Sequence, residues 1–259
     1  TWYSGVPTMH QAILMRAKKN PKLAEELALR FIRSSSASLP PAIFDELKKI
    51  FKTTVIEAYG MTEATHQMTS NPMPPDKQKA GFVGKPAGPE VCIMDTQGNK
   101  LDTGVDGEVC IRGNNVTNGY ENNEEANKNA FINGWFRTGD QGHFDDEGYL
   151  KISGRLKEII NRGGEKVSPL ELDNILMENE AVEQVVTFAV KDNLLGEAIG
   201  VAIVLKSGID CNETDIKNYA RKHLADFKIP KYIRFLEEIP KGATGKLQRI
   251  GLAEKLGLE

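Results

Sequence analysis

Residues 54–66, TVIEAYGMTEATH, begin as a mostly apolar run and pass through Gly60 into a polar segment. An apolar run of this length that ends in glycine is typical of a buried β-strand. Upstream, residues 39–52 (LPPAIFDELKKIFK) have apolar side chains at helical spacing behind two prolines, and residues 29–36 (LRFIRSSS) contain a second short apolar run. A strand, a helix and a strand of these lengths predict a parallel βαβ unit.

The residues that follow these two strands are candidates for ligand binding, because ligands of parallel sheets gather at the carboxyl ends of strands. The first strand is followed by Ser36-Ala37-Ser38, and the second by Tyr59, Gly60, Thr62 and Glu63. Glycine lets a ligand approach the backbone closely, and one carboxylate can hold Mg²⁺ when a nucleotide supplies further oxygen ligands. Spacing alone leaves open the alternative of an ordinary polar loop.

Two further parts follow this α/β segment. Residues 81–153 alternate short β runs with turns rich in glycine, asparagine and aspartate, which favours a small antiparallel sheet or barrel. Beyond them, Gly163-Gly164 indicates a two-residue hairpin, and the segment from Ser168 to Glu171 indicates a capping box that opens a helix over 169–178. The remaining elements of this α+β part are expected near 183–191, 198–205 and 232–236 as strands and near 214–225 as a helix.

The sequence therefore predicts a chain of mixed fold class, α/β followed by α+β, in two domains. Residues 1–154 are expected to form the C-terminal part of a larger domain, α/β to about residue 75 and β-rich over 81–153. Residues 155–259 are expected to form a compact, mobile α+β domain that acts as a lid.

Two charged residues near the domain boundary could bind a nucleotide. Asp140 lies in the segment NGWFRTGD, where we expect a turn, and its carboxylate could accept both hydroxyls of a ribose. An Asx turn, which binds no ligand, is the alternative. Arg155 follows at the boundary, from which a guanidinium can reach phosphate or ribose.

A third charged residue, Lys246, ends the segment PKGATGK near the C-terminus. This segment is not a Walker loop, because Pro240 stands where the first glycine belongs and Leu247 stands where serine or threonine belongs. A solvated surface lysine is the alternative to an anion-binding role.

The overall composition excludes several classes of protein. The 259 residues carry a net charge of −3 and are 40% hydrophobic, which is typical of a soluble globular protein and does not favour nucleic acid as a partner. No apolar run approaches the length of a membrane span. The three cysteines are odd in number and isolated, which argues against a disulfide framework or a cysteine-based zinc site.

Six short motifs of different composition follow one another along the chain, and they are VPT, YGMTE, GEVCIRG with a later GY, WFRTGD, GRLKEIINRGGEKVSP and PKGATGK. Their order resembles that of the adenylate-forming superfamily, which includes acyl-CoA synthetases, beetle luciferases and peptide-synthetase adenylation domains. The segments RFIRSSSASL and YGMTEATHQMTSNP are most similar to the 4-coumarate-ligase-like oxalate–CoA ligases of plants and fungi. Those proteins usually have cysteine at the position of Ser35 and often alanine at that of Gly60.

The resemblance implies a two-step reaction that uses ATP, Mg²⁺ and coenzyme A. It also implies roles for residues of the first domain, in which Tyr59 would stack on adenine beside Ser36-Ala37-Ser38. Thr62 would bind phosphate and Glu63 would bind Mg²⁺, while Asp140 would hold the ribose hydroxyls with the help of Arg155.

In the second domain, the resemblance implies a hinge at Lys157 and a pantetheine path along Gly163-Gly164. Lys246 would bridge carboxylate and phosphate oxygens during adenylation only. In the family's geometry, Ser36 and His66 face the acyl site, and their hydrogen-bond donors suit a short diacid such as oxalate. A histidine satisfied within its own loop is the alternative for His66.

The family's phosphate loop, rich in glycine, serine and threonine and carrying a lysine, is not found in these 259 residues. We therefore expect the chain to be a piece of a longer enzyme, with a missing N-terminal segment as its partner. An aryl- or medium-chain acyl-CoA ligase, a peptide-synthetase-like domain and a non-catalytic binding module are the alternatives to an oxalate–CoA ligase. The resemblance leads us to expect a cytoplasmic or peroxisomal location, although no S-K-L-type tail is present.

Overall fold

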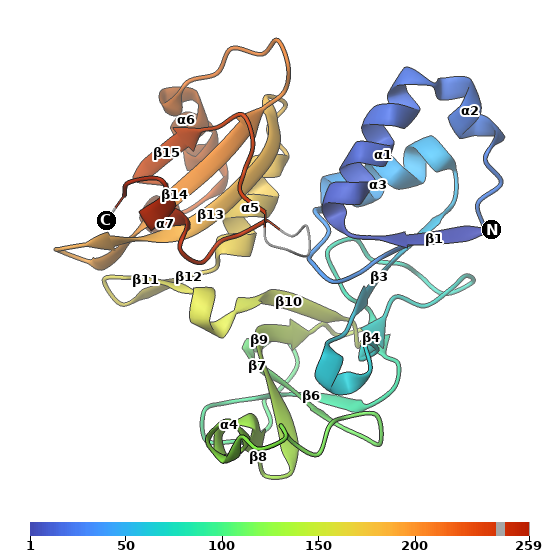
Figure 1. Ribbon diagram of the computed structural model, residues 1–259, viewed down its shortest axis with the longest axis vertical. Helices are drawn as coiled ribbons and strands as arrows, with labels where there is room; N and C mark the ends of the chain where they lie inside the picture. Colours follow the sequence, from blue (N-terminus) through green and yellow to red (C-terminus); the bar gives the residue numbers. More distant parts are fainter. Residues whose placement is uncertain (242–246, 259) are drawn as a thin grey trace. The chain divides into compact units, whose positions relative to one another are not determined.

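The computed structural model describes residues 1–241 and 247–258. The chain divides into two compact units, Thr1–Leu156 and Lys157–Glu259, and the division falls two residues after the expected boundary. In Figure 1 the first unit runs from blue to yellow-green and the second from yellow to red. Within the described ranges, no helix combines the length and the apolar character that a membrane crossing requires.

The first unit contains the predicted βαβ unit. Strands β2 (Phe31–Ser34) and β3 (Thr54–Tyr59) are parallel neighbours, and helix α3 (Pro41–Phe51) connects them. Helix α3 buries the stripe formed by Ile43, Phe44, Leu47 and Phe51. Each such side chain stabilises the fold by about 1.5–3 kcal/mol. The helix begins at a proline and is followed by Lys52, its C-cap, which takes a left-handed conformation with φ 47°.

Strand β1 (Trp2–Gly5) extends this sheet and was missed by the sequence analysis. It pairs in parallel with β2 and leads into α1 (Pro7–Lys19) and then α2 (Pro21–Glu26). Its four residues are too few for an alternating pattern to be recognised, and they end in Ser-Gly. On the other side, β3 is followed by the short antiparallel strands β4 (Thr69–Ser70) and β5 (Lys85–Pro86), so the sheet order is β1-β2-β3-β4-β5.

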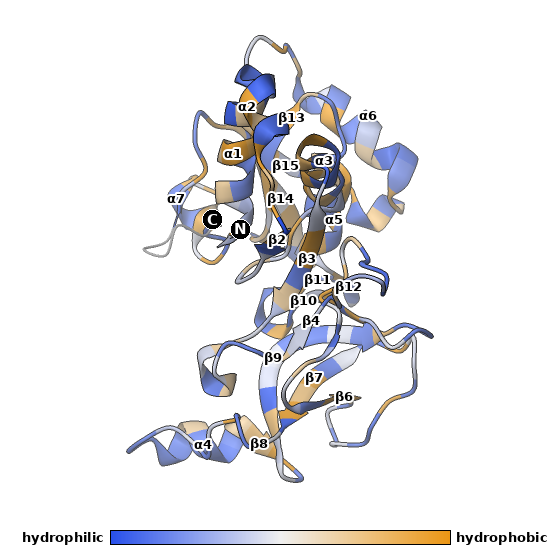
Figure 2. Ribbon diagram, turned by 90° about the vertical axis from the view of Figure 1, so that its right-hand side faces the viewer, coloured by the Kyte–Doolittle hydropathy of each residue, from blue (hydrophilic) through white to orange (hydrophobic). Residues whose placement is uncertain are grey.

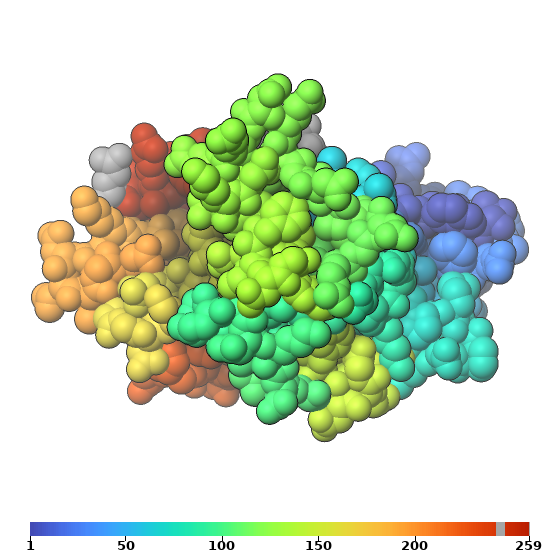
Figure 3. Space-filling view, turned by 90° about the horizontal axis from the view of Figure 1, so that it is seen from below, coloured from blue at the N-terminus to red at the C-terminus, as the bar shows by residue number. Residues whose placement is uncertain are grey.

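The β-rich part of the first unit is an antiparallel sheet, as predicted. Its strand order is β10-β9-β7-β6. A short strand, β8, follows helix α4 in the sequence and pairs with β9. The bounds are β6 (Glu90–Met94), β7 (Gly107–Arg112), α4 (Glu124–Ala130), β8 (Phe131–Ile132), β9 (Trp135–Phe144) and β10 (Leu150–Arg155). The green atoms of α4 and the loop before it project from this part in Figure 3.

The second unit has one five-stranded sheet in the order β12-β11-β14-β13, with β15 parallel to β14. The expected strands and helices are present at β11 (Ile160–Arg162), β12 (Glu165–Val167), α5 (Pro169–Met177), β13 (Val182–Asp192), β14 (Gly196–Leu205), α6 (Glu213–His223) and β15 (Tyr232–Phe235). Two 3₁₀ turns, η2 (Leu156–Glu158) and η3 (Asp226–Lys228), and helix α7 (Leu252–Lys255) were not expected. Orange marks the apolar strands β13 and β14 in Figure 2, whereas α6 is mostly blue.

The hairpin predicted in this unit is visible, and so is the Ser168 half of the predicted capping box. Gly163 and Gly164 connect β11 to β12 and both have positive φ, 62° and 99°, which explains why glycine occupies this turn. Ser168 Oγ accepts a hydrogen bond of 3.3 Å from the Glu171 backbone N–H at the start of α5. The Glu171 carboxylate contacts Lys228 Nζ at 2.6 and 2.7 Å.

Arg249 connects three elements of the second unit. Its guanidinium contacts Glu158 of η2 at 3.0 Å and Asp173 of α5 at 2.8 Å, and it donates to the Thr187 carbonyl of β13. Asp173 also accepts a hydrogen bond of 2.7 Å from the Thr187 backbone N–H. Two carboxylates and a carbonyl thus surround a mostly buried cation, which is the arrangement that a buried charge requires.

Glu57 of β3 is a buried acid in the core of the first unit, 3% exposed. Its Oε1 accepts a 2.8 Å hydrogen bond from the Gly81 backbone N–H. Burial raises the pKa of Glu57 to about 8, and the N–H groups of Gly81 and Leu39 oppose the rise. The folded protein binds the proton of the Glu57 carboxyl more tightly than the unfolded chain does. The resulting contribution to the stability of the fold is fully present below pH 4.5 and is lost as the pH rises through 8.

In the parent protein, ionisation of Glu57 should lower the free energy of unfolding by roughly 3–5 kcal/mol between acidic and mildly alkaline pH. We expect Glu57→Gln to abolish this pH dependence, since glutamine cannot ionise. Urea unfolding at both ends of this window measures the effect, followed by tryptophan fluorescence because Trp2 and Trp135 both lie in the first unit. The exposed Glu26→Gln variant serves as the control. An equal effect of Glu57→Gln at both pH values would contradict the prediction.

Candidate active site

Three strand ends of the first unit meet at one edge of its parallel sheet. Gly5, Ser34 and Tyr59 are the last residues of β1, β2 and β3. The parallel pairing sets Gly5 opposite Ser34 and Ser34 opposite Glu57, so β3 runs two residues beyond its neighbour. The segment Ser36-Ala37-Ser38 follows β2, and in it Ser36 has a positive φ of 73°. Ser36 and Ala37 are exposed and Ser38 is half-buried. The two predicted ligand-binding segments are thus brought to the same edge.

The turn after β3 is shaped by the backbone around Gly60. A 3₁₀ turn, η1 (Thr62–Ala64), is followed by Thr65 and His66, which have positive φ of 50° and 61°. A Cβ on Gly60 would lie 2.2 Å from the His66 carbonyl oxygen. The close approach at Gly60 is therefore made by the chain's own backbone, and an alanine there would require residues 66 and 67 to move. Thr62 and His66 are exposed at this turn.

Asp140 forms the buried centre of the site. It lies inside β9, so the expectation that it occupies a turn is wrong, and its side chain is only 6% exposed. Arg155 is its cross-strand partner on β10, and Arg155 Nε contacts Asp140 Oδ1 at 2.9 Å. The Tyr59 hydroxyl donates to Asp140 Oδ2 at 2.5 Å. Burial, the Asp140 charge and this hydrogen bond together raise the pKa of Tyr59 well above its usual value.

Glu63 has a partner that sequence analysis did not identify. The Tyr120 hydroxyl donates to Glu63 Oε1 at 2.9 Å, and the Thr117 backbone N–H donates to the Glu63 carbonyl at 2.7 Å. Burial and Glu63 raise the pKa of Tyr120. The only signal in the sequence was the GY pair at 119–120. The described residues contain no group of three or more histidine, cysteine or acidic side chains that could hold a metal ion.

Arg33 of β2 is a second residue that the sequence analysis missed. Its Nη1 donates to Ser4 Oγ at 3.3 Å, and its Nη2 donates to Gln67 Oε1 at 3.4 Å. Gln67 directly follows His66 in the sequence. The signal that could have revealed Arg33 is a charged residue inside an otherwise apolar strand at a candidate ligand edge.

The other predicted site residues lie in the second unit or outside the described ranges. Lys157 is exposed and is the first residue of the second unit. Gly163 and Gly164 form the β11–β12 turn, where the Gly163 backbone N–H donates to the Leu195 carbonyl at 2.8 Å. Lys246 lies outside the described residues.

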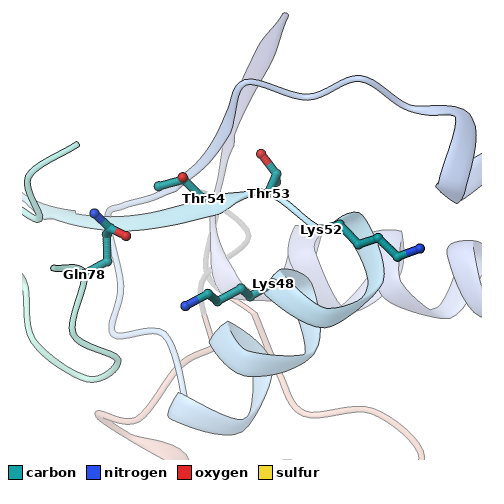
Figure 4. Close-up of a pocket in the computed structure, with 5 residues that line it drawn as sticks. All are labelled: Lys48, Lys52, Thr53, Thr54 and Gln78. Atoms are coloured by element: carbon teal, nitrogen blue, oxygen red, sulfur yellow. The ribbon is translucent and has the colours of Figure 1, made fainter. Parts of the chain in front are cut away.

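A surface hollow lies at the opposite end of β3 from Tyr59 (Figure 4). It has a volume of about 410 Å³ and is lined by Lys48, Lys52, Thr53, Thr54 and Gln78. It is therefore distinct from the strand-end site.

We expect Tyr59→Phe to destabilise the first unit by about 1–3 kcal/mol, because a buried carboxylate loses a hydrogen-bond donor. In the Asp140→Asn background the same change should cost less than about 1 kcal/mol, so the two substitutions are non-additive. Urea unfolding of the four proteins in this double-mutant cycle measures the coupling. Tyr120→Phe is the matched control, since its hydroxyl binds a carboxylate in a more exposed place. Additive effects of Tyr59→Phe and Asp140→Asn would contradict the coupling.

Comparison with known families assigns most of the chain. Residues 1–121 match the family described as AMP-binding enzyme, and residues 171–246 match AMP-binding enzyme C-terminal domain. The oxalate–CoA ligase of Arabidopsis thaliana is 51% identical over 250 residues, which cover 96% of this chain and 48% of that protein. The oxalate–CoA ligase of Saccharomyces cerevisiae is 50% identical over 255 residues, with coverage of 98% and 46%.

The fold is shared with solved structures. ATP-bound MatB from Rhodopseudomonas palustris superimposes with a TM-score of 0.91 at 31% identity, over 98% of this chain and 50% of that one. The predicted fold class is thereby confirmed, and the chain spans about half the length of the curated relatives it matches. The chain belongs to the adenylate-forming superfamily of AMP-binding enzymes, within which it resembles oxalate–CoA ligases.

Proposed function

We propose that this chain is part of an ATP-dependent acid–CoA ligase. In the first step, a substrate carboxylate oxygen attacks the α-phosphorus of ATP, and pyrophosphate leaves. In the second step, the CoA thiol loses its proton and its sulfur bonds to the acyl carbon, while the bond from that carbon to AMP breaks. The observation that carries this proposal is the buried Asp140 carboxylate, held between Tyr59 and Arg155 at the strand ends.

The nucleotide would bind at this carboxylate. Both Asp140 oxygens already accept hydrogen bonds, but an ionised carboxylate has about four lone-pair positions and can accept further bonds from ribose hydroxyls. Tyr59 would present its ring to adenine next to Ser36-Ala37-Ser38, and Arg155 would keep the carboxylate oriented. These assignments are supported by the hydrogen bond between Tyr59 and Asp140, by the pairing of Asp140 with Arg155, and by the position of Ser36-Ala37-Ser38 after β2, the neighbour of β3.

Phosphate and metal would bind on the turn after β3. Thr62 would donate its hydroxyl to phosphate, and Glu63 would hold Mg²⁺ together with phosphate oxygens. When bound, Mg²⁺ would supply positive charge to the reacting phosphates. Tyr120 would orient the Glu63 carboxylate through its hydrogen bond of 2.9 Å.

The second unit would supply different groups to the two steps. Lys246 would place its ammonium between the attacking carboxylate and the α-phosphate, where negative charge develops. Gly163 and Gly164 would line the path of CoA pantetheine, since their turn has no side chains to obstruct it. Lys157, at the boundary of the units, would be the hinge that exchanges these two groups.

The favoured acid is oxalate. Ser36 and His66 are exposed polar residues at neighbouring strand ends, and hydrogen-bond donors suit the second carboxylate of a short diacid better than a fatty or aromatic tail. The names of the relatives from Arabidopsis thaliana and Saccharomyces cerevisiae support the same acid. Catalysis would also require a segment that supplies the phosphate loop, and we propose that this segment precedes the chain in the whole enzyme. The whole enzyme would act in the cytoplasm or in peroxisomes.

The reaction can be tested with a reconstituted enzyme, made by joining this chain to the part of the Arabidopsis oxalate–CoA ligase that lies outside the region similar to this chain. We expect Lys246→Ala to lower ATP–pyrophosphate exchange by at least about a hundredfold, because the charge acts on the phosphate being attacked. Thioester formation from supplied acyl-adenylate should change by less than about threefold. Lys241→Ala is the control. Equal loss in both half-reactions would show that Lys246 is not specific to adenylation, and no acid-dependent exchange by the parent would favour a non-catalytic binding module.

The test of the substrate is a panel of acids. We expect the reconstituted enzyme to prefer oxalate over octanoic and cinnamic acids, and His66→Ala to lose about tenfold or more in kcat/KM for oxalate, since it removes a donor to the second carboxylate. His223→Ala, an exposed histidine of the second unit, is the matched control. Efficient use of cinnamic acid with oxalate inert would indicate an aryl-CoA ligase instead.

A further inference from the structure

We propose that Arg33 determines specificity by binding, with its guanidinium, the carboxylate of a short dicarboxylic acid that does not react. This inference rests on the proposed function, because it takes the acid to bind where β2 and β3 end. It assigns to Arg33 the charge that Ser36 cannot supply and that His66 supplies only when protonated.

The direction of the Arg33 side chain follows from the register of the sheet. Arg33 is paired with Ser4 of β1 and with Ile56 of β3, and cross-strand partners share a face. Tyr3, the neighbour of Ser4, points to the opposite face, where its hydroxyl lies 3.2 Å from Nδ1 of His10 on α1. Arg33 therefore projects from the face that α1 does not cover.

The contacts of Arg33 leave its charge uncompensated. Its two hydrogen bonds, of 3.3 and 3.4 Å, go to a hydroxyl and an amide oxygen, both neutral, and are longer than the usual 2.9 Å or so. Burial lowers the pKa of Arg33, and no carboxylate among the described residues opposes this shift. A half-buried cation with long bonds to neutral partners gains when an anion arrives.

The neighbours of Arg33 identify the anion. Ser36 lies three residues after Arg33 in the sequence. The Arg33 guanidinium donates a hydrogen bond to Gln67, the residue that follows His66. A guanidinium presents two parallel N–H donors, which match the two oxygens of a carboxylate. Oxalate joins its two carboxylates directly, so when one attacks phosphate the other lies within a single bond of the reacting carbon. A fixed charge at Arg33 would favour oxalate over monocarboxylates of the same size, in which a neutral group replaces the second carboxylate.

The test compares oxalate with glycolate, which replaces one carboxylate by a neutral hydroxymethyl group. In the reconstituted enzyme, we expect Arg33→Met to raise KM for oxalate and lower its kcat/KM by about a hundredfold, and to change kcat/KM for glycolate by less than about threefold. Arg33→Lys keeps the charge but loses the two parallel N–H donors, so its kcat/KM for oxalate should lie between those of the parent and of Arg33→Met. KM for ATP should stay unchanged. Arg30→Met, an exposed arginine just before β2, is the matched control.

Binding without turnover gives a second readout. Equilibrium dialysis with labelled oxalate should show weaker binding to Arg33→Met than to Arg30→Met. Equal losses for oxalate and glycolate would make Arg33 a structural support for Gln67, and undiminished use of oxalate by Arg33→Met would overturn the proposal while leaving the ligase function intact. A parent without acid-dependent pyrophosphate exchange would overturn both.

Discussion

The buried carboxylate of Asp140 ties together the two sheets of the first unit. Tyr59 reaches it from the last position of β3, and Arg155 reaches it from the last position of β10. A buried charge is stable only with partners, so the site keeps these strand ends in one arrangement. The same carboxylate gives the site a negative centre, and the Arg155 guanidinium on the neighbouring strand compensates it. The proposed recognition of a nucleotide would depend on this pair.

Local patterns were sufficient for most of the fold. The apolar stripe from Ile43 to Phe51 identifies α3, and two adjacent glycines identify the β11–β12 turn. These features are legible because helices, strands and tight turns are determined by residues close together in sequence. The order of six motifs then gave the family, which no single pattern could have done. The four-residue strand β1 lay below the length at which such patterns can be recognised.

The geometry of the site depends on contacts that no local pattern encodes. Tyr59 and Asp140 are 81 positions apart, and Glu63 and Tyr120 are 57 apart. Asp140 was expected in a turn because of its glycine neighbour, whereas pairing with β10 and β7 extends β9 through that position. The contacts of Arg33 were hidden for the same reason, since its partners come from β1 and from the segment after η1. Chemistry at individual positions could be inferred from the sequence, but the pairing of side chains required the fold.

The contacts of Arg249 have a consequence for the order in which the second unit folds. Its partners Glu158, Asp173 and Thr187 precede it by 91, 76 and 62 positions. During synthesis from the N-terminus, helix α5 and strand β13 are therefore complete long before the cation that neutralises their carboxylate emerges. Contacts of such high sequence separation close long loops at a cost in chain entropy. A nascent chain that stops short of residue 249 would leave two acidic side chains without this cation, so these contacts can form only after nearly the whole unit has been synthesised.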